Sequence, residues 1–462
     1  MAFDPIAGVN GVGGLPLGQF LQIAFTSGVF NQLNQTFPDF EMVKKFRVGD
    51  PNWREQRFML QTSLGPSAVQ YANPVSSTNF PKAQRISVSE KIAVSKELDA
   101  TVEIEYNLYK KALNSPLKYA EPLALEMQSK AIATKRRIAA DLYADGTGVI
   151  GTVASVAASS GKLVITLSAL SSSRGHVGLF EYGDLVTPYN PEGTAAHFPL
   201  VDSGTVAALR VVSRSRKNGT VTVEAIDANG NILDVADDQT GSTLVGNDVI
   251  YRSGQVDIPD LTSISDYALA SPVFAGFESL LANDGRKVHG IDMAGITAGT
   301  RVDCNGQLIA LKYVQEALSE AKVAVGQGLY KWDMLAMSPE ARDSLVEADE
   351  DKRRLTISDS QRVKGAKAFI FQHENDTLEV ISSEYIAPKR AFALPKQSAG
   401  QKAMMQLYFT EMTPVEVGSG KLHLKPASGG GHERRIASYM EGQIALLCTQ
   451  PAAGVVLENF TV

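Results

Sequence analysis

Residue types that carry covalent chemistry are scarce in this chain of 462 residues. It has 2 cysteines and 6 histidines, and it contains no run of about 18 apolar residues, the length that a membrane-spanning helix requires. The N-terminus has no basic region followed by an apolar one, so we expect neither a secretory signal nor a membrane span. Cys304 and Cys448 are far apart in sequence and are predicted to be buried free thiols rather than a disulfide.

An excess of charge of either sign is also missing. Charged residues make up 20% of the sequence, hydrophobic residues make up 44%, and the formal net charge is −6. This composition is typical of a soluble globular protein, and the length predicts two or three domains. A dedicated nucleic-acid-binding domain is normally basic, so that class is disfavoured. A protein that only encloses nucleic acid remains compatible, because a mildly acidic inner wall does not grip a polyanion.

Two glycine-rich runs resemble phosphate-binding loops but lack essential residues. Gly-Ser-Gly-Lys at 418–421 is followed by Leu422, where a magnesium-binding hydroxyl is needed, so we interpret the run as a flexible loop. Gly-Val-Gly-Gly at 11–14 has no strand before it, and Pro16 falls within the expected start of the helix. It therefore fails as a dinucleotide-binding fingerprint.

Histidines and acidic residues show no spacing typical of a metal site or a catalytic site. His432-Glu433 lacks the second histidine of a zinc-protease helix, and no Gly-x-Ser-x-Gly nucleophile elbow occurs. The acidic runs 237–238 and 349–351 do not follow a calcium-loop pattern, and we interpret both as solvated loops. We therefore expect no enzyme activity, no cofactor and no metal, although a triad scattered along the sequence would leave no such signature.

A long amphipathic helix is predicted over residues 116–148. Its basic residues are predicted to stay in water: Lys130, Lys135, Arg136 and Arg137. Gly146 and Gly148 should end the helix, because glycine readily adopts the left-handed conformations of a cap. Small or apolar residues recur at spacings of three and four and are predicted to form one buried face of the helix: Leu123, Met127, Ala131, Thr134, Ile138 and Leu142.

The sequence before this helix indicates an arm and an extended loop. Residues 1–50 are glycine-rich at the start and carry scattered phenylalanines, which we expect this arm to bury against a neighbouring structure or subunit. Alternating runs at 86–88, 92–94 and 102–108 indicate strands. Proline and glycine interrupt the middle of this extended region. We therefore expect two strands joined by an irregular tip, which together form a projecting β-hairpin.

Residues 152–255 have a β-rich texture in which no helical period survives. Asn218-Gly219 and Asn229-Gly230 are typical turn pairs. Short strands are predicted at 153–156, 163–167, 211–212, 220–225 and 249–252. This pattern predicts a small sandwich or barrel inserted between two parts of a host domain.

The final third of the chain alternates between helical and strand patterns. Helices are predicted at 272–281 and 305–325, a buried strand at 332–337, and a further helix that Ser338 caps and Pro339 begins. The buried face of the second helix is predicted to consist of Leu308, Leu311, Val314, Leu318, Ala321 and Val325. Further strands are expected at 368–372, 377–381, 404–410, 443–448 and 454–457. This part is therefore predicted to be an α/β region.

The order of these parts resembles the major capsid proteins of tailed bacteriophages, which have the Hong Kong 97-type fold. The run 141–151, with its Asp-Gly-Thr-Gly ending, is similar to the exit of the spine helix in that family. The runs 180–184 and 246–254 are similar to turns of an inserted domain, and 442–448 is similar to the closing strands. The resemblance implies an α+β fold with an N-terminal arm, an extended hairpin loop, a spine helix, peripheral and axial domains, and an inserted β-sandwich or barrel.

Together with the sequence texture, the resemblance divides the chain into six segments. They are the arm (1–50), the extended loop with peripheral strands (51–110), the spine helix (111–150), the inserted domain (151–256), the peripheral return (257–304) and the axial domain (305–462). No charged coiled-coil segment precedes the arm, so an internal scaffolding domain is not indicated. Some family members form lysine–asparagine cross-links, but Lys82, Lys91 and Lys96 are interpreted as solvated.

The resemblance implies a shell protein that assembles with itself into pentamers and hexamers and encloses double-stranded DNA without reading its sequence. A portal protein, a scaffolding protein and a decoration protein are the implied partners, and the virion, assembled in the host bacterial cytoplasm, is the implied location. The basic strip 135–137 is expected to pair with acidic groups of a neighbour rather than with DNA. The candidate inter-subunit contacts are Phe20, Phe25, Phe30, Phe37, Trp53, Phe58, Phe80, Lys135, Arg136 and Arg137.

Two alternatives remain open at this point. An encapsulin-like bacterial compartment would share the fold, although the inserted domain and the long arm disfavour it. A soluble hydrolase with a β-sandwich accessory domain belongs to another class, and the lack of a nucleophile–base or metal motif disfavours it.

Overall fold

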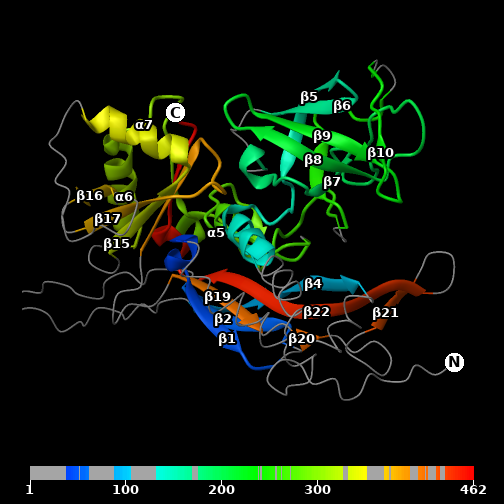
Figure 1. Ribbon diagram of the computed structural model, residues 1–462. Coiled ribbons are helices and arrows are strands. Elements are labelled where there is room, and N and C mark those ends of the chain that lie inside the picture. Colours follow the sequence, from blue (N-terminus) through cyan, green and yellow to red (C-terminus); the bar gives the residue numbers. More distant parts are fainter. Residues whose placement is uncertain are drawn as a thin grey trace, which may run out of the picture.

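The computed structural model is a mixed α+β structure, rich in sheets and with few helices, built around three larger sheets (Figure 1). A β-barrel and an α/β part lie side by side above a long sheet, and a helix over residues 132–143 lies between them. The structure describes residues 38–50, 53–61, 88–105, 132–168, 175–237, 239, 242–254, 258–261, 263–270, 272–325, 331–350, 369–373, 376–395, 404–410, 413–414, 423–426 and 432–462. No helix among these residues is long and apolar enough to cross a membrane.

The inserted β-rich region forms a closed antiparallel barrel. Its strands are β5 (Gly151–Ser159), β6 (Lys162–Leu167), β7 (Leu185–Tyr189), β8 (Ala208–Ser215), β9 (Thr220–Ile226) and β11 (Val249–Arg252), and the short β10 (Ile232–Leu233) is added to β9. The order β9-β6-β5-β11-β7-β8 closes on itself because β8 also pairs with β9. Alternate apolar side chains fill the interior: Val153, Leu163, Ile165, Leu209, Val211, Val221 and Val223. The strands expected from the sequence are confirmed, and the sheet is a barrel rather than a sandwich.

The first and last strands of the barrel are hydrogen-bonded neighbours. Val249 lies opposite Thr152, and Ile250 lies opposite Gly151. The predicted turns at Gly219 and Gly230 are also present, with positive φ angles of 65° and 85°. The chain therefore enters and leaves the barrel at one place.

A long sheet runs along the other side of the molecule (Figure 1). It contains β1 (Lys44–Val48), β4 (Lys96–Glu105), β19 (Met405–Thr410), β20 (Thr413–Pro414), β21 (His423–Pro426) and β22 (His432–Cys448). Strand β22 spans 17 residues and pairs with all of these except β1, including β4 over the whole length of β4. This strand is the backbone of the sheet.

The end of the predicted N-terminal arm belongs to this sheet and to the core, which corrects the expectation for residues 38–48. Strand β1 pairs in parallel with β19, and the short 3₁₀ helix Pro38–Met42 precedes it. The side chain of Phe40 is 1% exposed, and the Tyr143 hydroxyl donates a hydrogen bond of 2.7 Å to Asp39. No local pattern predicts this packing, because β19 lies far away in the chain. The preceding residues of the predicted arm lie outside the described residues.

A β-hairpin lies within the region that was predicted from the sequence to be extended. Strands β2 (Glu55–Gln61) and β3 (Val88–Val94) pair antiparallel over seven positions, from Glu55 opposite Val94 to Gln61 opposite Val88. The predicted irregular tip lies outside the described residues. Leu60 and Ala93 are buried on the inner face of the hairpin, which fixes that face toward the rest of the chain.

The α/β part contains a second six-stranded sheet. In sheet order its strands are β14 (Thr300–Asp303), β23 (Val455–Glu458), β18 (Arg390–Pro395), β15 (Trp332–Met337), β17 (Asp376–Ser382) and β16 (Phe369–His373). Helices α6 (Leu311–Val325) and α7 (Pro339–Glu350) accompany it, and the small hairpin of β12 (Lys287–Val288) and β13 (Ile291–Asp292) lies apart from it. The Ala341 amide donates to the Ser338 hydroxyl over 3.2 Å, so the predicted cap of α7 is confirmed.

Two helical predictions for this region need correction. Leu308 is 50% exposed, because helix α6 begins only at Leu311 and Leu308 instead forms a bridge with Thr461. The predicted helix at 272–281 is reduced to α5 (Phe277–Leu280), because Gly276 at its start packs against the backbone of another segment. The rest of the α6 face is buried as predicted, from Val314 to Val325.

The described part of the predicted spine helix covers residues 132–143. Ile138 and Leu142 are buried as predicted, and Thr134 is half-buried, while Leu123, Met127 and Ala131 lie outside the described residues. Lys135 was expected to stay in water but is only 2% exposed, and burial lowers its pKa. Ala139 and Ala140 are also buried, because the helix is enclosed by the parts around it on more than one face.

The end of this helix and the two cysteines agree with the sequence. Gly146 and Gly148 have φ angles of 86° and 79°, the left-handed conformation expected for them. Cys304 and Cys448 are free and buried, and burial raises the pKa of their thiols to about 11 and about 12. Neither thiol has the thiolate character that reactive cysteines need.

Candidate functional site

The predicted inter-subunit contacts fall into two groups. Trp53 and Phe58 pack within the chain, since the Trp53 ring lies 6.1 Å from Tyr408 and Phe58 lies edge-on to His289 at 6.4 Å. The five other aromatic residues of the prediction lie outside the described residues: Phe20, Phe25, Phe30, Phe37 and Phe80. Their contacts with other subunits stay predictions.

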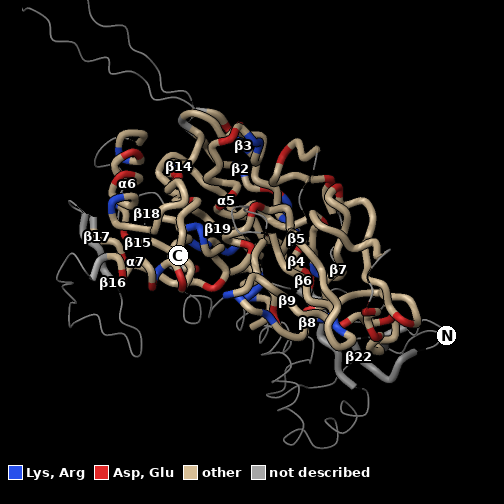
Figure 2. The backbone as a smooth tube through the Cα atoms, turned by 90° about the horizontal axis from the view of Figure 1, so that it is seen from above, with Lys and Arg blue, Asp and Glu red and all other residues tan. Residues whose placement is uncertain are grey.

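The basic strip at 135–137 has partners in its own chain. Arg136 forms an ion pair with Glu181 over 3.1 Å, and Arg137 forms one with Asp141 over 2.9 Å within the helix. Lys135 is buried. Acidic and basic residues are interspersed along the described chain (Figure 2). The role of this strip at a subunit interface stays a prediction.

The outer face of the β2–β3 hairpin carries two exposed apolar side chains among exposed charged ones, a feature that was not predicted from the sequence. Met59 is 67% exposed and Ile92 is 40% exposed, and the strand register places both on one face. Arg57, opposite Ile92, lies 3.6 Å from Glu90 on the same face. The signal was the run of three apolar residues Phe58, Met59 and Leu60, because successive residues of a strand point to opposite faces and one of the three must lie on the outer face.

A second feature is a polar junction around one turn of the α/β part. Residues 383–386 form the first part of the connection from β17 to β18, and side chains from the barrel reach this turn. Arg214 of β8 forms an ion pair of 3.1 Å with Glu384 and donates to the backbone oxygens of Gly178 and Phe180. Arg214 therefore ties the barrel both to its own loop and to the turn.

Arg216, the first residue after β8, makes a second connection. Its guanidinium pairs with Glu340 at the start of α7, at 2.8 Å and 2.9 Å, and donates to the backbone oxygen of Glu384 over 3.2 Å. A bidentate pair of this kind fixes orientation better than a single contact. The barrel is therefore joined to a helix and a turn of the α/β part.

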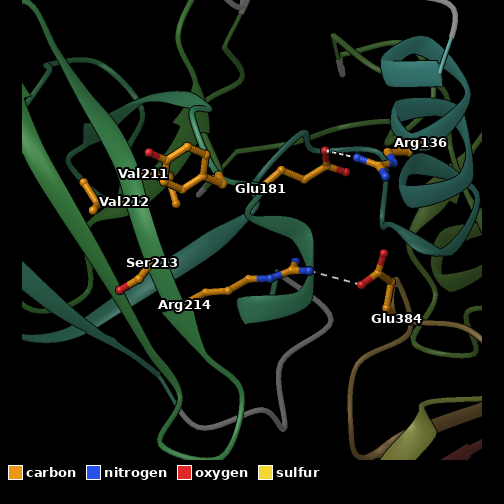
Figure 3. Close-up of a pocket in the computed structure, with 8 residues that line it drawn as sticks. Arg136, Glu181, Val211, Val212, Ser213, Arg214 and Glu384 are labelled. Carbon is orange, nitrogen blue, oxygen red and sulfur yellow. Dashed lines mark hydrogen bonds and ion pairs between the residues drawn. The ribbon is translucent and has the colours of Figure 1, made fainter. Parts of the chain in front are cut away.

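A cleft of about 300 Å³ opens beside this junction (Figure 3). In Figure 3, Arg136 points from helix 132–143 toward Glu181, and Arg214 points toward Glu384. Val211, Val212 and Ser213 of β8 and the exposed ring of Tyr182 complete the lining: Arg136, Glu181, Tyr182, Val211, Val212, Ser213, Arg214 and Glu384. The charged groups of the cleft neutralise one another in pairs, an arrangement suited to holding parts together rather than to proton transfer.

A buried cluster of charged side chains joins α5 to the α/β sheet. Arg301 contacts Glu278 at 2.6 Å and Glu458 at 2.7 Å, and Arg390 contacts the same carboxylates at 2.9 Å and 2.7 Å. Burial alone would raise the pKa of Glu458, but the two arginines reverse this and lower it. The four side chains form a closed ring of alternating charge.

The described residues form no evident metal site. No group of three or more histidine, cysteine, aspartate or glutamate side chains among the described residues is arranged to hold a metal ion. The partly buried His197 instead contacts Asp248 at 3.0 Å, and Lys91 and Lys96 donate to the backbone oxygens of Gly290 and Leu269. The residue Lys82 lies outside the described residues.

Comparison with known proteins finds similarity only among solved structures. No protein-family model matches the chain, and no curated protein matches it. The cyanophage A-1(L) capsid asymmetric unit is 6% identical, with 92% of this chain and 93% of that chain covered and a TM-score of 0.44. The satellite phage P4 procapsid including size determination (Sid) protein is 8% identical, with 95% and 100% covered and a TM-score of 0.36.

An encapsulin is also among the similar structures. The holo-SrpI encapsulin complex from Synechococcus elongatus PCC 7942 is 9% identical, with 93% of this chain and 90% of that chain covered and a TM-score of 0.38. Solved structures similar to this chain thus include phage capsid proteins, as the resemblance in the sequence predicted. At these identities and TM-scores the function of this chain does not follow from the likeness.

Proposed function

We propose that this chain is a shell-forming structural protein, the major capsid protein of a tailed phage with a Hong Kong 97-type fold. It assembles with itself into pentamers and hexamers of an icosahedral shell that encloses double-stranded DNA, and it has no enzymatic activity. The observation that carries this proposal is the pair of exposed apolar side chains, Met59 and Ile92, on the outer face of the β2–β3 hairpin.

The hairpin is held firmly by its own chain while its outer face is left open. The Lys91 ammonium donates to the Gly290 backbone oxygen over 3.1 Å, and the Phe58 ring packs against His289. A rigid element that presents Met59 and Ile92 outward loses little entropy when a second subunit covers it. Because apolar burial contributes about 25 cal/mol per Å², repetition of this contact around each ring favours closed assemblies.

The remaining roles follow from this proposal. The N-terminal arm and the tip of the hairpin contact neighbouring subunits, and helix 132–143 is the spine between the peripheral and axial parts. A portal protein, a scaffolding protein and a decoration protein are its partners, and the shell is assembled in the host bacterial cytoplasm and becomes the virion. The net charge of −6 suits a wall that encloses DNA without binding its sequence.

Size-exclusion chromatography and negative-stain microscopy of the purified chain test the proposal. We expect the wild type to form closed particles, and the double variant Met59→Glu, Ile92→Glu to remain as rings or monomers with an unchanged far-ultraviolet circular dichroism spectrum. Val323→Glu is the matched control, because Val323 is 84% exposed on α6 and lies outside the hairpin.

Two outcomes contradict the proposal. A wild-type chain that stays monomeric under all assembly conditions would contradict the proposed shell function. A double variant that forms normal particles would show that Met59 and Ile92 are not needed for assembly. Particles that protect protein cargo instead of DNA from digestion would favour the encapsulin-like alternative.

A further inference from the structure

Three parts of the chain converge on the turn 383–386. The barrel contributes the loop 175–181, Arg214 of β8 and Arg216 directly after β8, and the α/β part contributes the turn itself and Glu340 of α7. Helix 132–143 joins through Arg136, which pairs with Glu181 of the barrel loop. Any rotation of the barrel against the α/β part must break this set of contacts.

His176 lies at the centre of these contacts and uses both of its ring nitrogens. Its Nδ1 accepts a hydrogen bond of 3.0 Å from the Gly178 amide, so this nitrogen carries no proton. Its Nε2 therefore carries the proton and donates over 3.0 Å to the backbone oxygen of Tyr385 in the turn. The ring is 4% exposed. Only the neutral ring, in this one tautomer, satisfies both contacts.

The loop has no room to adjust if His176 gains a second proton. A proton on Nδ1 would point at the Gly178 amide hydrogen, and the loop would have to move. Gly178 already packs so closely on the turn that a Cβ atom there would lie 2.2 Å from the Glu384 backbone oxygen. Movement toward the turn is blocked, so the strain is relieved only by movement of the loop away from it.

We propose that this junction is an acid-operated clamp. Neutral His176 holds the barrel on the turn 383–386, and protonation of His176 releases the barrel while the barrel and the α/β part both stay folded. The clamp is a property of the single chain and does not depend on the proposed shell function.

The charges around His176 oppose its protonation on balance. Burial is the largest effect, the guanidinium groups of Arg216 and Arg214 add to it, and the Tyr385 carbonyl and Glu340 act against it, so that the pKa of His176 is lowered to about 4. The charged and titratable groups that face the ring from the surrounding elements are Arg214, Arg216, Glu340, Glu384, Tyr385, Tyr143, Glu278 and Arg390.

The released state takes up a proton more readily than the clamped one. In the released loop the ring regains its ordinary pKa of 6.5, against about 4 in the clamp. Between these two values the equilibrium constant for opening rises about tenfold for each unit of decrease in pH, or about 300-fold in all. Opening is therefore a one-proton process with a defined pH range.

Hydrogen exchange of the full chain, read by mass spectrometry from pH 7 to pH 4 and corrected for intrinsic exchange, tests the clamp. We expect peptides covering 175–181 and 383–386 to lose protection by about tenfold per pH unit below 6.5, while strands β6 and β9 stay protected. In His176→Gln the exchange of these two segments should become independent of pH over this range.

His197→Gln is the matched control, because His197 is a partly buried barrel histidine that contacts Asp248 rather than the turn. It should keep the wild-type pH dependence. The clamp is overturned if His176→Gln keeps that dependence, which would assign the transition to a carboxylate at the turn, Asp39, Glu340 or Glu384. It is equally overturned if, in the wild type, β6 and β9 lose protection together with the two segments, which would be general acid unfolding.

Discussion

At the scale of single residues, Gly276 decides whether two distant segments can touch. A Cβ atom at this position would lie 2.4 Å from the backbone oxygens of both Asp141 and Ala144, at the end of helix 132–143. The Ser279 hydroxyl also donates to the backbone oxygen of Asp145. The start of α5 therefore covers the carbonyl groups that the end of a helix leaves without partners.

Gly276→Ala should lower the free energy of unfolding by about 1–3 kcal/mol, because the methyl group forces two backbone segments apart. Gly49→Ala is the control, since a Cβ atom at Gly49 meets nothing within 4 Å, and it should change stability by no more than about 0.5 kcal/mol. Urea unfolding followed by circular dichroism measures both. Equal stability of the two variants would show that the helix end tolerates separation from α5.

The ring of charges around Glu278 gives a second prediction. Glu278→Gln should destabilise the chain by about 3–5 kcal/mol, because Arg301 and Arg390 would keep buried charges with one carboxylate fewer. Glu55→Gln, which removes an exposed contact of 3.8 Å with Arg57, should cost less than about 1 kcal/mol. Comparable losses in urea unfolding would contradict the special role of the buried ring.

Acid should weaken the same ring. The pKa of Glu458 is lowered below its ordinary value of 4.5, so its contribution to stability is present above pH 4.5 and is lost as the pH falls through its pKa in the folded chain. Urea unfolding between pH 6 and pH 3 should show this loss in the wild type and a smaller one in Glu458→Gln. An unchanged slope in the variant would assign the acid sensitivity to other carboxylates.

Residue roles that depend on local conformation could be predicted from the sequence, whereas roles that depend on distant partners could not. Gly146, Gly148 and the Ser338 cap follow from helix ends, which are local. The burial of Lys135 depends on parts of the chain that enclose the helix from several sides, and the role of His176 depends on Tyr385 in another part of the fold. No period or motif in the sequence encodes either contact.

The same division holds at the scale of elements. Alternation and turn residues predicted β5, β6, β8, β9 and β11 of the barrel and part of β3 in the hairpin, because these signals lie within a few residues. Strands β2, β7 and β10 were not predicted. The parallel pairing of β1 with β19, the register of β4 on β22 and the closure of β8 on β9 join segments by hydrogen bonds of the backbone, which leave little trace in side-chain types. The barrel could therefore not be told from a sandwich.

Closure of the barrel predicts that it folds alone. A closed sheet has no free edge in its ring and encloses its own apolar core, so a fragment of residues 150–253 should give a β-type circular dichroism spectrum and a cooperative thermal transition. The fragment 150–226 is the control, since it lacks β11 and cannot close. Non-cooperative melting of the longer fragment, or equal behaviour of both, would show that the barrel depends on the rest of the chain.

At the scale of the whole molecule, the end of the arm separates residues that we expect to act in assembly from residues that the fold itself needs. Deletion of residues 1–36 should leave the described core intact and abolish closed particles, if the arm acts between subunits. Deletion of residues 1–43 removes Phe40 and Asp39 from the core and should also destabilise the fold, by about 3–5 kcal/mol for the aromatic ring alone.

Circular dichroism and analytical ultracentrifugation distinguish these outcomes. The shorter deletion should keep the spectrum and shift sedimentation from particles to small species, whereas the longer one should lose cooperative unfolding. Normal particles from the shorter deletion would make the arm dispensable, and a stable fold in the longer one would make the burial of Phe40 unimportant.

The pairing of β5 with β11 also bears on how the chain folds. Neighbouring strands lie about 4.8 Å apart, so the host segments on either side of the barrel are brought together as if by a two-residue link. Loop-closure entropy grows with the length of the disordered segment between two contacts, and a barrel that has already folded removes most of that length. Early folding of the barrel should therefore bring helix 132–143 and α5 together at little entropic cost and speed the folding of the parts around them.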